Sequence, residues 1–203
     1  SVLLSSPDIS EKNVAMLNDI KNDADSLIVM VENLLSVTRI QDSTIPLKKH
    51  EEMLEEVAGD AILTIRRRFP GYKVGLDLSE DILLLPMEPL LIKQVMVNLL
   101  ENAIRHSGDM EHITLHLFRQ DNWAVVEVRD RGKGLSPEVC QAVQSGKPLP
   151  RSLSGDTTRG MGIGLSVCQS IIKAHGGFFA AGNDPEGGAV FRFGLPMEEP
   201  EHE

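Results

Sequence analysis

Apolar residues recur with helical spacing over residues 94–107, so this stretch is predicted to form one helix with a buried side. Asn98 and Asn102 are four residues apart and therefore lie on one side of that helix, with Arg105 one turn further on. Two carboxamides and a guanidinium along one edge favour an anion site with a metal ion between the protein and its ligand. The alternative is a polar helix face that only meets water, and this stretch alone leaves both open.

A longer periodic stretch covers residues 11–40, where seam positions follow one another in steps of three and four: Leu17, Ile20, Ala24, Leu27, Val31, Leu34 and Thr38. A narrow seam of about three heptads is typical of a coiled coil or a four-helix bundle. The alternative is an amphipathic helix that lies on its own globular domain. The length of the stretch and its narrow seam favour the bundle.

Between residues 45 and 196, helical and strand-like periods alternate. Strands are expected over 45–49, 72–78, 81–86, 113–118, 123–128, 178–181 and 189–195, and helices over 51–69, 94–107 and 164–174, with a short helical pattern at 139–143. These elements predict an α/β (α+β) two-layer sandwich, in which a mixed, mostly antiparallel sheet of about five or six strands is covered by three helices. Residues 134–160 are rich in Ser, Pro and Gly, and a connection of that length is usually a functional lid.

Composition narrows the class of protein. The 203 residues suffice for one good-sized domain, or for one domain plus an appendage, and no apolar run is long enough to cross a bilayer. A formal net charge of −10 argues against a nucleic-acid partner, because the phosphate backbone would be repelled. Cys140 and Cys168 lack metal-type spacing and are expected to be free thiols in a reducing cytoplasm. No targeting segment is visible, and the start at Ser1 without an initiator Met suggests a fragment.

Two glycine clusters carry the sharpest chemical signals. In the first, Asp130 ends an apolar strand and is followed by Gly132 and Gly134. Glycine lets the backbone pass close to a ligand, and a carboxylate at a strand end can accept hydrogen bonds from an exocyclic amine such as that of adenine. In the second, three alternate glycines over residues 160–164 lead into a helix, whose free N–H groups and positive dipole end suit a polyphosphate.

The familiar phosphate-binding motifs do not fit the second cluster. A dinucleotide fold needs a different glycine spacing directly after a strand, whereas here a lid precedes the glycines. A P-loop also fails, because no Gly-Lys-Ser/Thr sequence follows. Either cluster alone could also consist of glycines in ordinary turns.

Together and in this order, these features resemble the ATP-binding domain of sensor histidine kinases, which shares its wider fold with gyrase, Hsp90 and MutL. The matching segments are residues 98–106 for the N box, 130–134 and 160–165 for the two glycine boxes, 172–177 for the usual helix end and 187–191 for the closing strand motif. The resemblance covers about residues 45–196, and three boxes in order make a chance match very rare.

The resemblance also implies a domain layout. The helix expected over residues 11–41 resembles the second helix of the dimerisation and phosphoacceptor hairpin, so residues 1–44 would be a partial hairpin. Residues 45–196 would be the ATP-binding catalytic domain, and the acidic tail at 197–203 is expected to be disordered. Within the family, the sequence of these motifs most resembles that of Kdp-type potassium-responsive kinases.

The resemblance implies ATP and Mg²⁺ as ligands and assigns roles to single residues. Asp130 would fix the adenine amino group, His106 would pack on the base, and Arg105 would contact the phosphates. Asn102 would ligate Mg²⁺ through its amide oxygen. Asn98 stands where the hydrolysing relatives have a catalytic glutamate, and a neutral amide there favours transfer of the γ-phosphate over its loss to water.

The remaining implied positions surround the nucleotide. Glu101, between the asparagines, is either a base or a residue that faces solvent, and a supporting role is preferred. Arg159 at the end of the lid would reach the γ-phosphate. The rest of the site would come from the glycine boxes, at Gly132, Gly134, Gly160, Met161, Gly162, Ile163, Gly164 and Leu165.

The chain departs from the family pattern in two respects. The phosphoacceptor context, a His followed by an acidic residue with a Pro shortly after, is absent at every histidine: His50, His106, His112, His116, His175 and His202. The usual Phe-rich box of the lid is also missing, with residues 139–150 in its place. The chain is therefore expected to bind ATP but not to phosphorylate itself.

As an enzyme, the chain would transfer phosphate to a histidine outside this fragment, for relay to the receiver domain of a response regulator. The full-length protein would be a homodimer, weakened in this fragment, and the fragment would be the cytoplasmic portion of a membrane-bound bacterial sensor kinase. The atypical lid motivates an alternative, a nucleotide-sensing or pseudokinase module that signals without transfer. A hydrolase is a third interpretation, against which Asn98 argues.

Overall fold

The computed structural model describes residues 47–145 and 161–198, with six isolated residues nearer the amino terminus: Asn13, Met16, Leu17, Ile20, Ala24 and Val31. Most of the predicted long helix over 11–41, most of the lid and the tail after residue 198 lie outside the described residues, and those predictions stay open.

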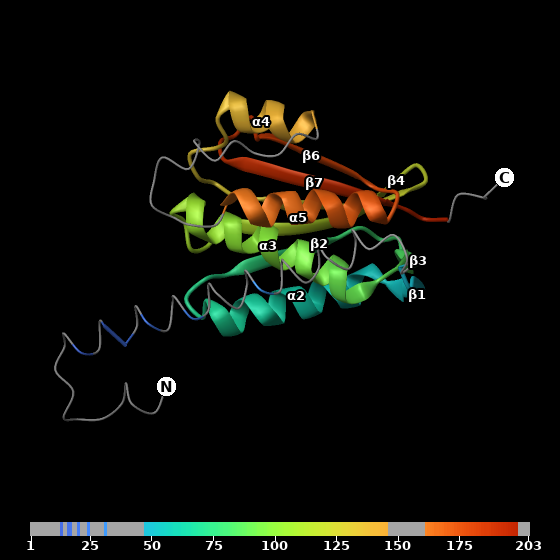
Figure 1. Cartoon of the computed structure of the whole chain (residues 1–203), viewed down its shortest axis with the longest axis horizontal. Coiled ribbons are helices and arrows are strands. Elements are labelled where there is room, and N and C mark those ends of the chain that lie inside the picture. The colour runs from blue at the N-terminus through green and yellow to red at the C-terminus, as the bar shows by residue number, and fades with distance from the viewer. Residues whose placement is uncertain are drawn as a thin grey trace.

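A five-stranded sheet forms one layer of the domain (Figure 1). Its strands, in spatial order, are β2 (Val74–Leu78), β4 (Ile113–Gln120), β5 (Trp123–Arg129), β7 (Ala189–Pro196) and β6 (Phe178–Asn183). β2 pairs with β4 in parallel, and the other three pairings are antiparallel. The predicted mixed, mostly antiparallel sheet is confirmed.

The start of the domain differs from the prediction, because it forms a separate two-stranded sheet. β1 (His50–Met53) pairs with β3 (Leu84–Met87), while Leu47 to Lys49, where a strand was expected, are not in a strand. The helix predicted from residue 51 begins only at Leu54, whose N–H donates to the carbonyl of Leu83. Pairing with a distant strand therefore overrides the local helical pattern of Glu51 and Glu52.

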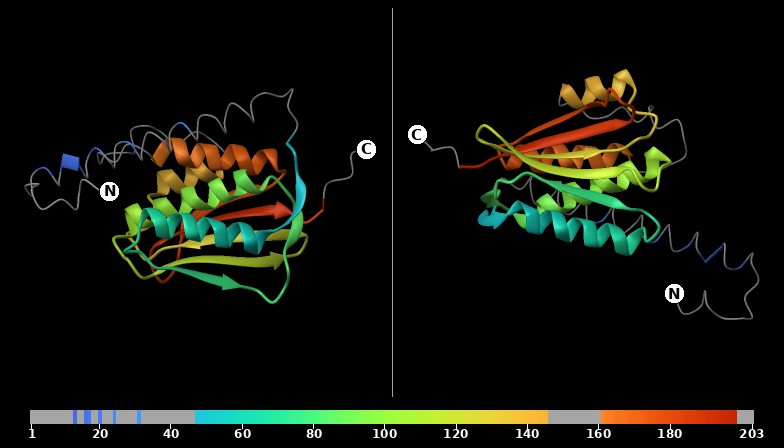
Figure 2. Two further views of the ribbon diagram at one scale, coloured as in Figure 1. Left: turned by 90° about the horizontal axis from the view of Figure 1, so that it is seen from below. Right: turned by 180° about the vertical axis from the view of Figure 1, so that it is seen from behind.

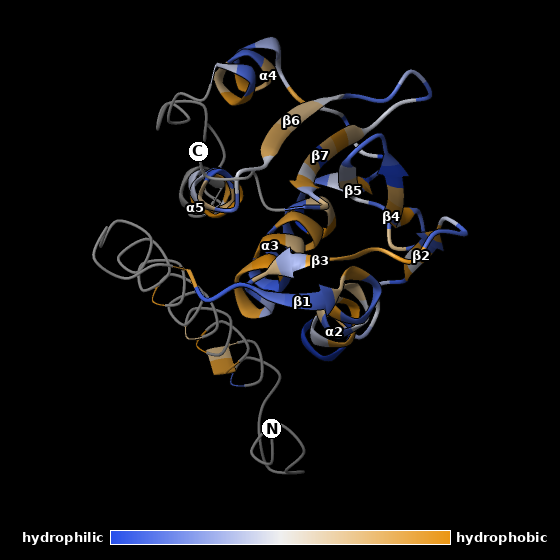
Figure 3. Ribbon diagram, turned by 90° about the vertical axis from the view of Figure 1, so that its right-hand side faces the viewer, coloured by the Kyte–Doolittle hydropathy of each residue, from blue (hydrophilic) through white to orange (hydrophobic). Residues whose placement is uncertain are grey.

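Three helices cover one face of the large sheet (Figure 2), as predicted. They are α2 (Leu54–Arg68), α3 (Pro89–Ser107) and α5 (Met161–Ala174). A fourth helix, α4 (Pro137–Gln144), lies beside β6 (Figures 1 and 3), and the hydroxyl of Ser136 accepts a hydrogen bond from its first turn. Across the described ranges, none of the helices combines the length and hydropathy that a membrane span requires.

The hydrophobic core centres on α3, which lies between α2 and α5 and packs against the sheet (Figure 3). Its fully buried side chains are Ile92, Val95, Met96, Leu99 and Leu100. Pro89 occupies the first turn of α3, and Gly108 ends the helix with a φ of 67°. Burial of each large aliphatic side chain contributes roughly 1.5–3 kcal/mol. The core therefore fixes the rotation of α3 and with it the direction of its polar edge.

Candidate functional site

The polar edge of α3 carries two buried or half-buried amide groups, and one nitrogen atom of Asn102 has no partner within the described ranges. Asn98 is 7% exposed although it is an asparagine. Nδ2 of Asn102 is buried and has no hydrogen-bond partner among the described residues. Because a half-turn exchanges the oxygen and nitrogen of a carboxamide, this unpartnered position can present either atom to a ligand. An amide in this state can pair with a ligand at no cost to the internal hydrogen bonds of the domain.

Asp130 is held rigidly beside the end of β5. It is 5% exposed, and its Oδ1 accepts hydrogen bonds from the backbone N–H groups of Gly132 at 2.8 Å and Ala189 at 3.2 Å. Its own N–H donates to the carbonyl of Ala189. One carboxylate oxygen is thus committed to the backbone, which leaves Oδ2 to receive a donor from a ligand.

Gly132 brings the first glycine box against the end of α3. A Cβ atom there would lie 2.5 Å from Cα of Ser107 and 2.9 Å from the carbonyl oxygen of His106, so only glycine permits this approach. Gly188, in the turn between β6 and β7, has a φ of 99°, and its Cβ would overlap the carbonyl of Asp130. The close approaches join Asp130 to the helix that carries the asparagines.

Asn183 is a supporting residue that the sequence pattern does not predict. Its Oδ1 accepts the N–H of Leu135 at 2.6 Å, and its Nδ2 donates to the carbonyl of the same residue at 3.0 Å. Gly134, with a φ of 74°, lies against this side chain. The two hydrogen bonds fix the glycine loop to β6. No local sequence pattern around Asn183 predicts this contact.

His106 lies at the junction between α3 and the glycine loop. Burial lowers the pKa of His106, the positive charges of Lys133 and Arg105 lower it further, and Asp130 opposes them. The imidazole is therefore neutral near pH 7 and presents a flat, uncharged ring close to the Asp130 carboxylate.

Most of the second glycine box lies in the first turn of α5, so the helix begins before residue 164, where its start was predicted. The helix begins at Met161, so Gly162 and Gly164 belong to its first turn, where N–H groups have no intrahelical partner. A Cβ on Gly164 would lie 4.0 Å from Cγ of Asn98. The positive end of α5 therefore lies beside the asparagine edge of α3.

Comparison with known proteins decides what this arrangement is. The family of histidine kinase-, DNA gyrase B- and HSP90-like ATPases matches residues 87–199. The chain belongs to this family.

The relatives of this ATPase domain are sensor kinases. The chain is 34% identical over 183 residues to the sensor protein KdpD of Clostridium acetobutylicum, with 90% of the chain and 20% of that protein covered. It is 36% identical over 171 residues to KdpD of Escherichia coli, covering 83% of the chain and 19% of that protein. The catalytic domain of histidine kinase ThkA superposes with a TM-score of 0.64 at 24% identity, covering 75% of this chain and 97% of that one, which shows the shared fold.

These findings confirm the predicted ATP-binding domain of the sensor-histidine-kinase type and its fold class. The chain spans about a fifth of the length of the KdpD proteins that it matches.

Five further predicted positions of the ATPase domain are paired with another helix, buried in the core, exposed, or outside the described residues. Glu101 does not face solvent, because it is 6% exposed and its carboxylate is paired with Arg68. The side chain of Leu165 is fully buried in the core. Arg159 and Gly160 lie outside the described residues, and Arg105 is exposed at the end of α3.

Cys168 is buried next to the asparagine edge. Burial raises the pKa of its thiol to about 12, while a hydrogen bond with Asn98 acts in the opposite direction. Such a thiol is not a nucleophile at neutral pH, so its role in the ATPase domain is to pack.

Proposed function

We propose that this domain transfers the γ-phosphate of MgATP to a histidine side chain on a dimerisation helix outside the described residues. The observation that carries the proposal is the convergence on α3: Asn98 lies beside the start of α5, and the end of α3 abuts the loop of Asp130. This convergence supports an adenine site and a polyphosphate site along one helix. The similarity to two KdpD sensor proteins supports a kinase within this family.

The residues of the chain have separable tasks in this proposal. Oδ2 of Asp130 accepts a hydrogen bond from the adenine amino group, and the neutral ring of His106 packs against the base. Asn98, Arg105 and the first N–H groups of α5 bind the phosphates. The attacking imidazole nitrogen forms a bond to the γ-phosphorus, the bond to the bridging oxygen breaks, and ADP leaves. Asn98 carries no charge and does not deprotonate water, which favours transfer over hydrolysis.

The residues present fit a magnesium ion that arrives with the nucleotide. The described residues contain no group of three His, Cys, Asp or Glu side chains that could hold a metal. The unpartnered amide of Asn102 offers one oxygen ligand, and phosphate oxygens would supply the charge that Mg²⁺ requires. When bound, the ion neutralises charge on the phosphates.

The whole protein extends the proposal beyond this domain. We expect a homodimer in which a phosphoacceptor helix meets the ATP site, and a response regulator whose receiver domain takes the phosphate. Residues 1–44 would contribute to the dimerisation hairpin, and membrane attachment would come from segments outside the described residues. The similarity to KdpD supports this layout.

Phosphotransfer in trans tests the proposal. The chain is incubated with γ-³²P-labelled ATP and a separate domain that carries the acceptor histidine. Label on the acceptor is expected with Mg²⁺, and chelation of the ion should abolish it. Asn102→Ala should lose transfer at least about tenfold, whereas Asn122→Ala, the same change in the exposed turn after β4, should not.

Two outcomes would reject the proposal. Nucleotide binding without any labelled acceptor would indicate a sensing module that signals without transfer. Steady release of inorganic phosphate by the wild-type chain alone would indicate a hydrolase.

A further inference from the structure

A partly buried ion pair joins the end of α2 to α3, beside the asparagine edge. Nη1 of Arg68, the last residue of α2, donates to Oε1 of Glu101 at 2.6 Å. The side chain of Glu101 is 8% exposed and that of Arg68 is 32% exposed. Glu101 stands between Asn98 and Asn102, about 4.5 Å and 1.5 Å from them along the helix axis.

Packing alone does not account for a carboxylate at this position. The neighbours of Glu101 on the buried side of α3, such as Leu100 and Ala103, pack through apolar side chains. Removing a carboxylate from water costs several kcal/mol, and apolar residues of similar volume often stabilise a fold equally well or better. The Arg68 charge is favourable at the carboxyl end of α2, yet that position needs no buried partner. The pair therefore has a consequence besides stability.

We propose that Arg68 is a positioning residue for the nucleotide site: it neutralises Glu101 and holds it against α2, so that α3 presents its asparagines without an uncompensated negative charge beside the phosphates. The inference rests on the proposed function. A charge pair one helix diameter apart, about 10 Å, at an effective dielectric constant near 20, changes an equilibrium constant on the order of tenfold. Loss of Arg68 would therefore penalise ATP in proportion to its phosphate charge.

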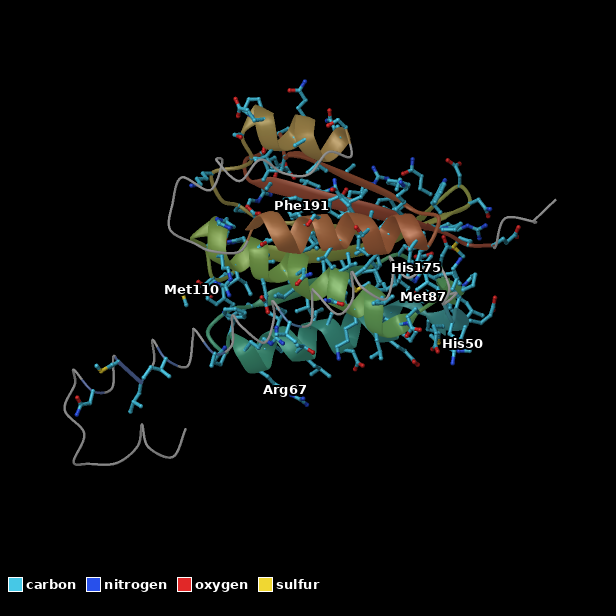
Figure 4. All side chains as sticks on the ribbon, viewed as in Figure 1. His50, Arg67, Met87, Met110, His175 and Phe191 are labelled. Atoms are coloured by element: carbon cyan, nitrogen blue, oxygen red, sulfur yellow. The ribbon has the colours of Figure 1, made fainter. Side chains whose placement is uncertain are left out.

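The ratio of ATP to adenosine affinity isolates this effect from a structural one. Affinities for adenosine, AMP, ADP and ATP are measured by displacement of a fluorescent nucleotide. Arg68→Met is expected to weaken ATP binding about tenfold, ADP binding less, and adenosine binding less than about twofold. Arg67→Met is the matched control, because Arg67 is exposed and points away from the domain (Figure 4). It should change the ratio less than about twofold.

Two further variants give the sign of the effect. Glu101→Gln removes the negative charge and keeps the Arg68 charge, so it should raise the ratio of ATP to adenosine affinity. The double variant Arg68→Met with Glu101→Gln removes both charges and should return the ratio to within about threefold of the wild type. If Arg68→Met does not fold, Glu101→Gln decides the matter alone.

Equal loss across the nucleotide series would overturn the inference, since it would show that the pair only maintains the fold. An unchanged ratio in Glu101→Gln would overturn it as well. A wild-type chain that binds neither ATP nor ADP would instead contradict the proposed function, so the two failures are distinguishable.

Discussion

In the proposed site, Asp130 divides its two carboxylate oxygens between the protein and the nucleotide. Oδ1 receives two backbone N–H groups, so its position does not depend on whether a nucleotide is bound. This division explains why an aspartate, and not an isosteric amide, suits the position. An asparagine could keep the backbone contacts through its single oxygen, but it would turn an NH₂ group toward the adenine amine.

Asp130→Asn is therefore expected to weaken ATP binding at least about tenfold while the melting temperature changes little. Calorimetric titration with MgATP measures the affinity. Asp121→Asn makes the same chemical change in the exposed turn between β4 and β5 and should bind like the wild type. Equal affinities for wild type and Asp130→Asn would remove Asp130 from the site.

Adding one methyl group at two different glycines is expected to change the free energy of unfolding in opposite directions. At Gly132 a Cβ would meet the backbone of α3 at 2.5 Å, whereas at Gly59, inside α2, nothing lies within 4 Å of the added atom. Gly132→Ala should lower the free energy of unfolding by about 1–3 kcal/mol. Gly59→Ala should raise it by about 0.5–1 kcal/mol, because alanine is the better helix former.

Urea unfolding of both glycine variants checks this pair of predictions. The same sign for both would mean that the contact between the glycine loop and α3 is not as tight as described.

At the level of elements, His175 ties the end of α5 to the start of α3. Its Nε2 accepts the N–H of Glu88 at 3.1 Å, and its Nδ1 lies 2.8 Å from the carbonyl oxygen of Ile171 (Figure 4). The first contact requires an unprotonated Nε2. Burial lowers the pKa of His175 in the folded state, which agrees with a neutral ring.

This geometry predicts that acid weakens the joint. The unfolded chain binds a proton near pH 6.5, whereas the folded chain binds it only at lower pH. The stability that His175 contributes is therefore present above pH 6.5 and is lost as the pH falls toward the folded-state pKa, by at most about 1.4 kcal/mol per pH unit.

Chemical denaturation between pH 5 and 8 measures the slope. His175→Phe should reduce it relative to the wild type, while His50→Gln, a change at an exposed histidine, should keep it. Identical slopes for wild type and His175→Phe would contradict a neutral, hydrogen-bonded His175.

Elements whose pattern lies within one segment could be predicted from the sequence, whereas contacts between distant segments could not. The β4–β5 hairpin and α3 followed from periodicity and turn residues, because their patterns arise within one segment. The small β1–β3 sheet did not, because Glu51 and Glu52 favour a helix until a strand more than 30 residues away pairs with them. The clamp by Asn183 and the Arg68–Glu101 pair were equally invisible, since each joins segments that are distant in the chain.

At the scale of the whole domain, α3 is both the centre of the core and one wall of the site. The same helix buries Val95 and Leu99 and exposes its asparagine edge to the start of α5. Strand order and the parallel β2–β4 pairing set the distance between the Asp130 loop and that edge, and no sequence pattern specifies them. The sequence motifs predict which residues form the site, but the topology of the domain brings these residues together along one helix.

The most direct test of this arrangement is a crystal structure of the chain at a saturating concentration of Mg²⁺ and a non-hydrolysable ATP analogue. The adenine amino group is expected within about 3 Å of Oδ2 of Asp130, with the phosphates between the Asn98–Asn102 edge and the first turn of α5. A nucleotide bound elsewhere, or no nucleotide at saturation, would contradict the account.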